Sequence, residues 1–328
     1  MCNWQLSLKR AVTDPSELCR ELALDPKMFP QISEATAHFP LRVPRGFIAR
    51  MEKGNPEDPL LLQVLPQARE LIDSPGYCLD PLNEKKSNRV PGLLHKYDGR
   101  VLLTLSGACA IHCRYCFRRH FPYDENTPGK KGWNRIFDYL KSDISITEII
   151  LSGGDPLTVK DNMLVEFVSY LEKITHLKRL RIHTRLPIVI PERITNEFIH
   201  LLDHTRLLPT IVIHCNHPNE IDKSVATTLR SLQRTRTTLL NQSVLLKNIN
   251  DQAETLIRLS KNLFKAGVLP YYLHLLDRVQ GAAHFEVSEV QAQYLITEMI
   301  KSLPGYLVPK LVQEIADAPA KIPVVTTL

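Results

Sequence analysis

From residue 100 onward, short apolar runs alternate with helix-like stretches, and this alternation restricts the fold more than any other feature. The runs are continuous and rich in β-branched residues, as expected of parallel strands buried on both faces. Strand-like runs occupy residues 100–106, 147–153, 180–184, 209–215, 241–246 and 270–276, and helix-like stretches lie near 134–142, 160–174, 193–204, 222–235 and 251–266. Six repeats are too few for a closed eight-stranded barrel, so a partial barrel and an open doubly wound sheet are the two α/β options.

The chain before residue 95 has a different character. It is irregular and rich in proline, and its short helical patches are separated by breaker residues. A chain of 328 residues can form one large α/β barrel or two ordinary domains. The sequence therefore predicts a mainly helical N-terminal extension over residues 1–95, an α/β barrel over 96–285 and a short C-terminal segment over 286–328.

Charge and hydropathy exclude several classes of protein. The formal net charge is +6, and the lysines and arginines are scattered without an aromatic platform, which argues against binding nucleic acid. No apolar run approaches the roughly 18 residues of a membrane helix, and the N-terminus lacks the apolar core of a secretion signal. We therefore expect a cytoplasmic protein that does not enter a membrane. Disulfides are rare in that compartment, so the seven cysteines are expected to be ligands or inert thiols.

Three cysteines stand close together directly after the first strand-like run, in GACAIHCRYCFRRHFP (residues 107–122). A closed zinc or iron–sulfur site normally uses four protein ligands. The thiolates of Cys109, Cys113 and Cys116 would hold three irons of a [4Fe–4S] cluster and leave the fourth iron open. The alternatives are a zinc knuckle completed by His112 or His120, or three buried thiols. The remaining cysteines, which we expect to be inert, are Cys2, Cys19, Cys78 and Cys215.

Unusual polar residues follow the other strand-like runs. SGGDP (152–156), HTR (183–185) and HCNHPNE (214–220) follow the second, third and fourth runs, NQ (241–242) opens the fifth, and Asp277 ends the sixth. In both candidate architectures, ligands bind at the carboxyl ends of the strands. Two glycines without a Cβ would let the backbone approach a ligand closely, and the alternative is a tight turn. The residues predicted here to bind a cofactor are Gly153, Gly154, Asp155, His214 and Gln242.

The C-x3-C-x2-C spacing after a first barrel strand resembles the radical S-adenosylmethionine (SAM) superfamily. In that superfamily SAM chelates the open iron of the cluster. The resemblance implies a partial (β/α)6 barrel, a [4Fe–4S] cluster and SAM. It also implies that Tyr115 packs near the adenine and that the Gly-Gly-Asp segment holds the amino end of SAM.

A longer resemblance narrows the family. HKYDGRVLLTLSGACAIHCRYCFRRHF, LSGGDPL, HTRLPIVIPERIT, HCNHPNEI, NQSVLLKNIND, PYYLHLLDRVQGAAHF and DAPAKIPV occur in uninterrupted order from about residue 90 to the end. Together they resemble the lysine 2,3-aminomutase family. Its members use SAM and pyridoxal 5′-phosphate (PLP) to move an amino group from the α to the β carbon of an amino acid, which implies an isomerase.

The resemblance assigns residues to PLP. Lys321 in DAPAKIPV matches the lysine that binds PLP covalently, as PLP chemistry requires. Tyr97 and Arg100 stand where the family contacts PLP, together with Lys96, a position at which arginine is usual. The resemblance therefore implies that the short C-terminal segment binds PLP.

The resemblance also assigns residues to an L-lysine substrate. Arg118 matches the arginine that pairs with the α-carboxylate, a task that suits a planar guanidinium, and its neighbour Arg119 competes for the role. Asp277 and Asp317 match the two carboxylates that bind the far ammonium of lysine. The resemblance further implies an external electron donor of the flavodoxin or ferredoxin type.

One departure from the family points to a branch within it. Free-standing family members carry a structural zinc, but Gln252 replaces the first zinc cysteine and the sequence ends seven residues after Lys321. No structural zinc is therefore expected. This pattern resembles the branch that makes (R)-β-lysine, which a separate ligase attaches to elongation factor P. The alternatives are a producer of free β-lysine for catabolism or osmotic balance, and a non-catalytic iron–sulfur protein.

Overall fold

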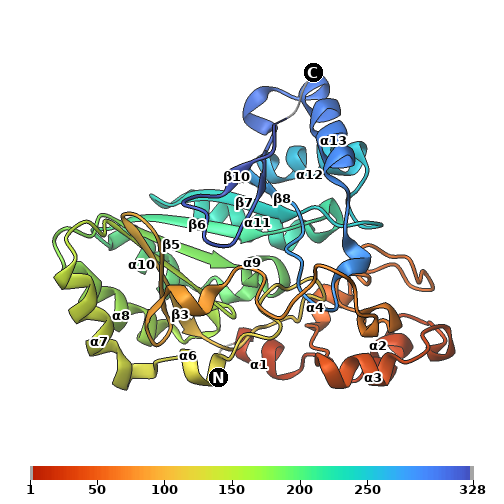
Figure 1. The fold of residues 1–328 in the computed structure, drawn as a ribbon, viewed down its shortest axis with the longest axis horizontal. Coiled ribbons are helices and arrows are strands. Elements are labelled where there is room, and N and C mark those ends of the chain that lie inside the picture. The colour runs from red at the N-terminus through yellow and green to blue at the C-terminus, as the bar shows by residue number, and fades with distance from the viewer. Residues whose placement is uncertain (1–2, 326–328) are drawn as a thin grey trace.

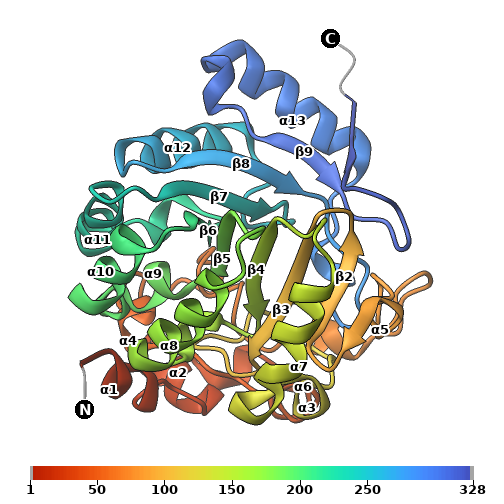
Figure 2. The same cartoon turned by 90° about the vertical axis from the view of Figure 1, so that its left-hand side faces the viewer.

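The computed structural model describes residues 3–325, which form one ten-stranded sheet whose strands follow each other in chain order. The strands are β1 Asn88–Val90, β2 Leu93–Tyr97, β3 Arg100–Ser106, β4 Glu148–Gly153, β5 Arg179–Thr184, β6 Leu208–His214, β7 Thr238–Val244, β8 Leu269–His274, β9 Lys310–Gln313 and β10 Ile322–Pro323. Strands β3 to β9 are parallel. Antiparallel strands extend both ends, β2 and β1 beside β3 and β10 beside β9. Figure 2 shows the strands side by side in a curved fan that does not close.

Helices connect successive parallel strands and pack along the sheet (Figure 1). The helices are α1 Asn3–Lys9, α2 Pro15–Glu21, α3 Ile32–His38, α4 Arg45–Ile48, α5 Glu84–Ser87, α6 Tyr123–Asn126, α7 Gly129–Ser142, α8 Asp161–Glu172, α9 Leu186–Val189, α10 Asn196–His204, α11 Lys223–Gln233, α12 Ala253–Lys265 and α13 Glu289–Ser302. Short 3-10 helices lie at Pro26–Met28, Ala68–Leu71, Pro156–Thr158, Pro191–Arg193, Pro218–Glu220, Ala283–Phe285 and Gly305–Leu307.

Local sequence explains why these elements form. In β4, five successive residues after Glu148 are buried, which fits a strand covered on both faces. In α8, the apolar positions Leu164, Phe167, Val168 and Leu171 recur at helical spacing and are all buried. Helix α11 begins where the side chain of Asp222 accepts a hydrogen bond from the backbone of Val225 at 2.8 Å.

The predicted fold class is confirmed, because six strand–helix units from β3 to α13 form a partial (β/α)6 barrel. The six predicted strand runs correspond to β3–β8. A seventh parallel strand, β9, was not predicted from the sequence; it pairs Leu311 with Leu273 of β8. This strand has only four residues, so its apolar run was too short to be recognised.

The N-terminal extension packs against the barrel. Leu18, Phe47 and Leu60 from the extension belong to the same cluster of buried side chains as Leu103 and Ile149 from the sheet. Figure 2 shows helices α1–α4, in red and orange, beneath the strands. The boundaries at residues 95 and 285 stay predictions, since extension and barrel share this hydrophobic core. No helix within residues 3–325 is long and apolar enough to cross a membrane.

Candidate functional site

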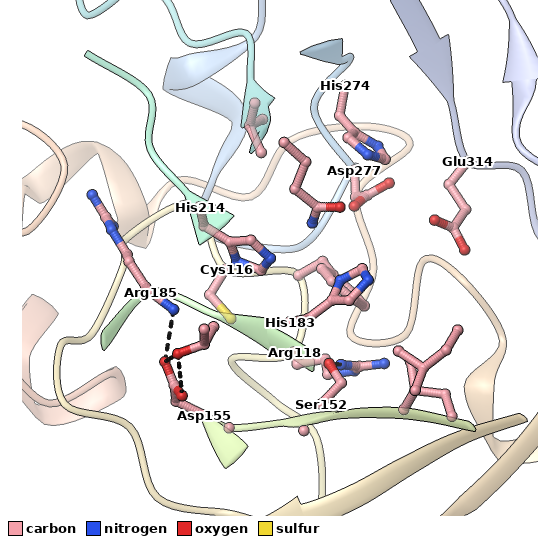
Figure 3. Close-up of a pocket in the computed structure, with 18 of the residues that line it drawn as sticks. Cys116, Arg118, Ser152, Asp155, His183, Arg185, His214, His274, Asp277 and Glu314 are labelled. Atoms are coloured by element: carbon pink, nitrogen blue, oxygen red, sulfur yellow. Dashed lines mark hydrogen bonds between the residues drawn. The ribbon is translucent and has the colours of Figure 1, made fainter. Parts of the chain in front are cut away.

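A cavity of about 760 Å³ runs along the inner face of the partial barrel to the carboxyl ends of the strands. Almost all sequence-predicted site residues line it: Tyr97, Arg100, Cys109, Cys113, Tyr115, Cys116, Arg118, Gly153, Gly154, Asp155, His214, Gln242, Asp277 and Lys321. Asp317 does not line it. In Figure 3, Cys116, Asp155 and Arg185 lie toward one end, Asp277 and Glu314 lie at the other, and His183 lies between them.

The three cysteines of the predicted cluster lie on the loop between β3 and α6 and line the same end of the cavity. They are free thiols. Burial and the neighbouring thiols raise the pKa of Cys109, and the same two causes raise that of Cys116 to about 11. Such crowded thiols are stable as thiolates only when a cation replaces their protons, which is the donor chemistry of an iron–sulfur cluster. Within residues 3–325, no three metal-binding side chains are already arranged around one ion position. The cysteines therefore suit an iron–sulfur cluster by the chemistry of their thiols and not by a preformed geometry.

The two histidines of the zinc alternative are engaged elsewhere. His112 Nδ1 lies 2.8 Å from the carbonyl oxygen of Pro40, and the ring stacks on Phe39 at 5.3 Å. His120 Nε2 lies 3.4 Å from the carbonyl oxygen of Gln280. These contacts do not favour a zinc knuckle. Of the cysteines expected to be inert, Cys19 and Cys215 are buried and Cys78 is exposed, while Cys2 lies outside the described residues.

The Gly-Gly-Asp segment after β4 is shaped by the protein's own backbone. A Cβ on Gly153 would lie 2.8 Å from the carbonyl oxygen of Ser106, and one on Gly154 would lie 2.5 Å from that of Ala108. The segment therefore needs glycine in order to pack on the cysteine loop, and the binding of a ligand by Gly153 and Gly154 stays a prediction. Asp155 accepts hydrogen bonds from Thr184 Oγ1 at 2.7 Å and from the backbone N–H of Arg185 at 2.8 Å. This carboxylate joins the ends of β4 and β5.

Arg185 was not assigned a role from sequence, although HTR was noted at the end of its strand. Its Nη1 lies 2.7 Å from Cys113 Sγ and 2.8 Å from Tyr115 Oη. Its Nη2 donates to Glu220 at 3.0 Å and to Gln63 at 2.6 Å. A buried guanidinium thus supports the cysteine loop from β5. Its partners lie far apart in the sequence, so no local pattern could have revealed the contact.

The middle of the cavity carries buried polar atoms that have no partner among residues 3–325. They are the Nε2 atoms of His183, His214 and His274 and Oε1 of Gln242. Burial lowers the pKa of His214 to about 3 and holds those of His183 and His274 well below the usual range, so the imidazoles are neutral. Buried polar atoms are normally hydrogen-bonded, and these four therefore point to polar ligands in the cavity.

Lys321 lies at the opposite end, where the β9–β10 hairpin reaches the barrel. Its ammonium pairs with Glu314, whose other oxygen accepts from Lys96 at 3.3 Å and Tyr97 at 3.0 Å. Burial opposes ionisation of Glu314, but the charges of Lys321 and Lys96 prevail and lower its pKa to about 2. Glu314 was not predicted from the sequence, because without β9 nothing indicated which side of the hairpin faces the cavity.

The surroundings of Lys321 suit a phosphorylated aromatic aldehyde. Lys321 offers an amine, and its Nζ lies 5.9 Å from the ring centre of Tyr272. Arg100 and Arg181 line the same cavity and supply positive charge, and Arg100 lies 4.7 Å from the ring centre of Tyr97. An amine, two aromatic rings and two guanidiniums are the groups that such a cofactor needs.

The two arginines after the cysteines have different partners. Arg118 donates to both carboxylate oxygens of Glu84, at 2.8 and 2.6 Å, and to Ser152 Oγ at 3.2 Å. Arg119 pairs with Glu70 at 2.8 Å and donates to the carbonyl oxygen of Gly281. Arg118 therefore connects the cysteine loop to β4, whereas Arg119 connects the same loop to the N-terminal extension.

The two aspartates predicted to bind one ammonium are far from equivalent. Asp277 lines the cavity after β8, and its side chain makes no hydrogen bond or ion pair within residues 3–325. Burial and the charge of Glu314 raise the pKa of Asp277 to about 7. Asp317 is 63% exposed and pairs with Lys86 on the outside of the protein. The expected Asp277–Asp317 pair is thus not formed, and Glu314 faces the cavity instead.

The sequence and the fold of this chain are similar to those of known proteins. Residues 98–205 match the family described as a 4Fe-4S single cluster domain. An L-lysine 2,3-aminomutase of Haemophilus influenzae is 52% identical over 97% of this chain and 94% of its own length. The Escherichia coli protein of that name is 51% identical over 98% of this chain and 94% of its own length. The protein of that name from Clostridium subterminale is 31% identical over 98% of this chain and 77% of its own length. A solved radical SAM methyltransferase from Sphaerobacter thermophilus overlaps 67% of this chain and 68% of its own at a TM-score of 0.44 and 15% identity.

Proposed function

Since the chain belongs to the lysine 2,3-aminomutase family of radical SAM isomerases, we propose that it converts L-lysine to (R)-β-lysine with the help of PLP. One observation carries the proposal. A single cavity holds the three cysteines at one end and Lys321, Asp277 and Glu314 at the other. A radical source and a site for an amine-bearing substrate would therefore share one cavity.

The chain's own residues would hold the cofactors at the two ends of the cavity. Cys109, Cys113 and Cys116 supply the cluster thiolates, and Lys321 supplies the amine for PLP. Bound there, the cluster with SAM supplies a carbon-centred radical, and PLP supplies a conjugated ring that shares the unpaired electron. The partnerless polar atoms of His214 and Gln242 lie on the neighbouring strands β6 and β7 and suit the hydroxyl groups of a nucleoside.

Lysine would be bound by opposite charges at its two ends. Arg118 would bind the α-carboxylate, because its guanidinium lines the cavity and lies between Cys116 and Glu314 (Figure 3). Asp277 and Glu314 would bind the side-chain ammonium, and Glu314 takes the place predicted for Asp317, which is exposed. Two carboxylates attract an ammonium and repel the side chain of glutamate, which makes the site selective for lysine.

The histidines in the cavity add no charge to it. Burial keeps the imidazoles of His183, His214 and His274 neutral at physiological pH. Neutral imidazoles can form hydrogen bonds with polar ligands without adding charge to the cavity. Burial would also strengthen the contacts of Arg118, Asp277 and Glu314 with a charged substrate, because charges interact more strongly in a low-dielectric interior.

We further propose that the β-lysine serves the modification of elongation factor P by a separate ligase, with a flavodoxin or ferredoxin as electron donor. One feature supports this branch: Gln252 stands where the family resemblance leads us to expect a zinc cysteine. Production of free β-lysine for catabolism or osmotic balance is the second candidate.

The test is anaerobic incubation of the reconstituted protein with L-lysine, SAM, PLP and a strong reductant, followed by chiral chromatography. We expect (R)-β-lysine from lysine and no β-amino acid from an equal concentration of L-glutamate. A spectrum with cluster bands but no product would contradict the aminomutase proposal. Adding elongation factor P and its ligase tests the branch: β-lysine that the ligase does not attach would favour the second candidate.

A further inference from the structure

Helix α5 forms part of the cavity wall near Arg118. The stretch from Asp80 to Asn88, called the α5 segment below, contains α5 and precedes β2, against which α5 packs. Glu84 and Ser87 line the cavity. Figure 2 shows the segment in orange beside β2, below the dark blue loop of the β9–β10 hairpin. The segment therefore touches both the substrate cavity and the part of the chain that carries Lys321.

The inner side of the α5 segment holds Arg118. Glu84 accepts from Nε and Nη2 of Arg118 at 2.8 and 2.6 Å, a bidentate geometry. The side chains are only 10% and 7% exposed. Arg118 also stacks against Phe117, with 4.8 Å from its guanidinium carbon to the ring centre. Two fixed hydrogen bonds and a stacked ring leave the guanidinium one orientation, in which Nη1 contacts Ser152 of β4.

The outer side of the same segment is held by Asp317. Asn83 Nδ2 donates to Asp317 at 3.2 Å, and Lys86 Nζ lies 3.5 Å from the same oxygen. Asp317 adopts a φ of 61°, a conformation that few non-glycine residues adopt, and this turns the hairpin loop toward the α5 segment. Only three residues separate Asp317 from Lys321. Asp317 thus connects the hairpin of Lys321 to the segment that holds Arg118.

We propose that the α5 segment positions Arg118 for the substrate carboxylate, with Glu84 orienting the guanidinium and Asp317 clasping the segment to the C-terminal hairpin. This inference rests on the proposed function for the identity of the substrate. Glu84 and Asp317 are positioning residues, because both act through Arg118. The clasp gives Asp317 a role that differs from the substrate contact expected from its motif.

The burial of Glu84 argues that it stays in place when the substrate binds. Arg118 is its sole ion-pair partner among residues 3–325, so leaving Arg118 would strand a buried carboxylate. The substrate would then approach the remaining Nη1 edge of the guanidinium. The opposite possibility, that Glu84 blocks Arg118 until the substrate displaces it, predicts the opposite change in lysine affinity on mutation.

Steady-state kinetics of the reconstituted enzyme separate these possibilities. We expect Glu84→Gln to raise KM for lysine at least about tenfold with a smaller change in kcat, because a neutral amide orients a buried guanidinium poorly. Asp317→Asn and Lys86→Ala should raise KM by about two- to fivefold, the range for an exposed ion pair. Glu84→Asp, which keeps the charge, should recover part of the loss. A lower or unchanged KM for Glu84→Gln would overturn the proposal.

Hydrogen exchange tests the clasp without relying on turnover. In Asp317→Asn and Lys86→Ala, amide exchange should quicken over residues 80–88, and in Glu84→Gln also over residues 116–119. Lys301→Ala removes another surface ion pair, on α13, and should alter neither amide exchange over residues 80–88 and 116–119 nor KM for lysine. Unchanged exchange in Asp317→Asn would overturn the clasp.

The outcomes also separate the clasp from the proposed function. Failure of the wild type to make β-lysine, with faster exchange in the variants, would reject the proposed function but keep the clasp. If Glu84→Gln does not fold, the exposed pair still decides the matter.

Discussion

Asp277 offers the sharpest test of substrate recognition, because its carboxylate faces the cavity with no partner of its own. The side chain makes no hydrogen bond or ion pair within residues 3–325, and burial with the charge of Glu314 raises its pKa to about 7. A bound lysine ammonium would supply the missing counter-charge. Asp277→Asn keeps the shape of the side chain and removes only the charge, so the variant isolates that interaction.

The structure sets the size of the effect in two ways. Loss of one partner from a buried charge pair costs about 2–5 kcal/mol, which corresponds to about a 30- to 5000-fold fall in kcat/KM for lysine. The raised pKa adds a pH dependence whose sign follows from the charge. The carboxyl group is about 90% ionised at pH 8 and about 10% ionised at pH 6, so its contribution to kcat/KM should fall about tenfold between these values.

The assay is β-lysine formation measured anaerobically from pH 6 to 8 with saturating SAM and PLP. Other groups titrate in this range, so the informative quantity is the ratio of wild type to Asp277→Asn at each pH. That ratio should rise with pH through about 7, while SAM binding stays the same in both proteins. An Asp277→Asn enzyme with wild-type kcat/KM, or a ratio that does not change with pH, would refute the reasoning.

Four further predictions concern the cofactors and stability. Cys113→Ala should lose cluster iron and SAM cleavage, because two thiolates cannot anchor the cluster, whereas Cys215→Ala should keep both in iron analysis and SAM-cleavage assays. Lys321→Ala should fail to trap PLP on borohydride reduction and should form no β-lysine, and labelling of another lysine in the wild type would contradict the assignment. Glu70→Gln should lower the free energy of unfolding by about 3–5 kcal/mol in urea titrations, because it leaves two buried arginines without a counter-charge. Elemental analysis should find no stoichiometric zinc, and one zinc per chain would reopen the choice of branch.

The sequence by itself determined the α/β class and the end of the barrel where chemistry can occur. Runs such as RVLLTLS and TEIILSG are apolar on both faces, and only a parallel sheet covered by helices buries such strands. Because parallel strands share one direction, residues that follow them gather at one edge. The sequence alone therefore predicts that the cysteine loop, Asp155 and His214 lie close together, and all of them line the cavity.

Only the tertiary structure decided which charged residues meet. Glu84 reaches Arg118 across 34 positions, and Arg185 reaches Cys113 across 72, so neither contact has a local signature. The C-terminal hairpin shows the same principle. Glu314 directly follows β9, which pairs with β8, and lines the cavity, whereas Asp317 lies in the turn of the hairpin and is exposed. Side-chain direction depends on strand register, and register is set by the neighbouring strand, which a motif such as DAPAKIPV does not contain.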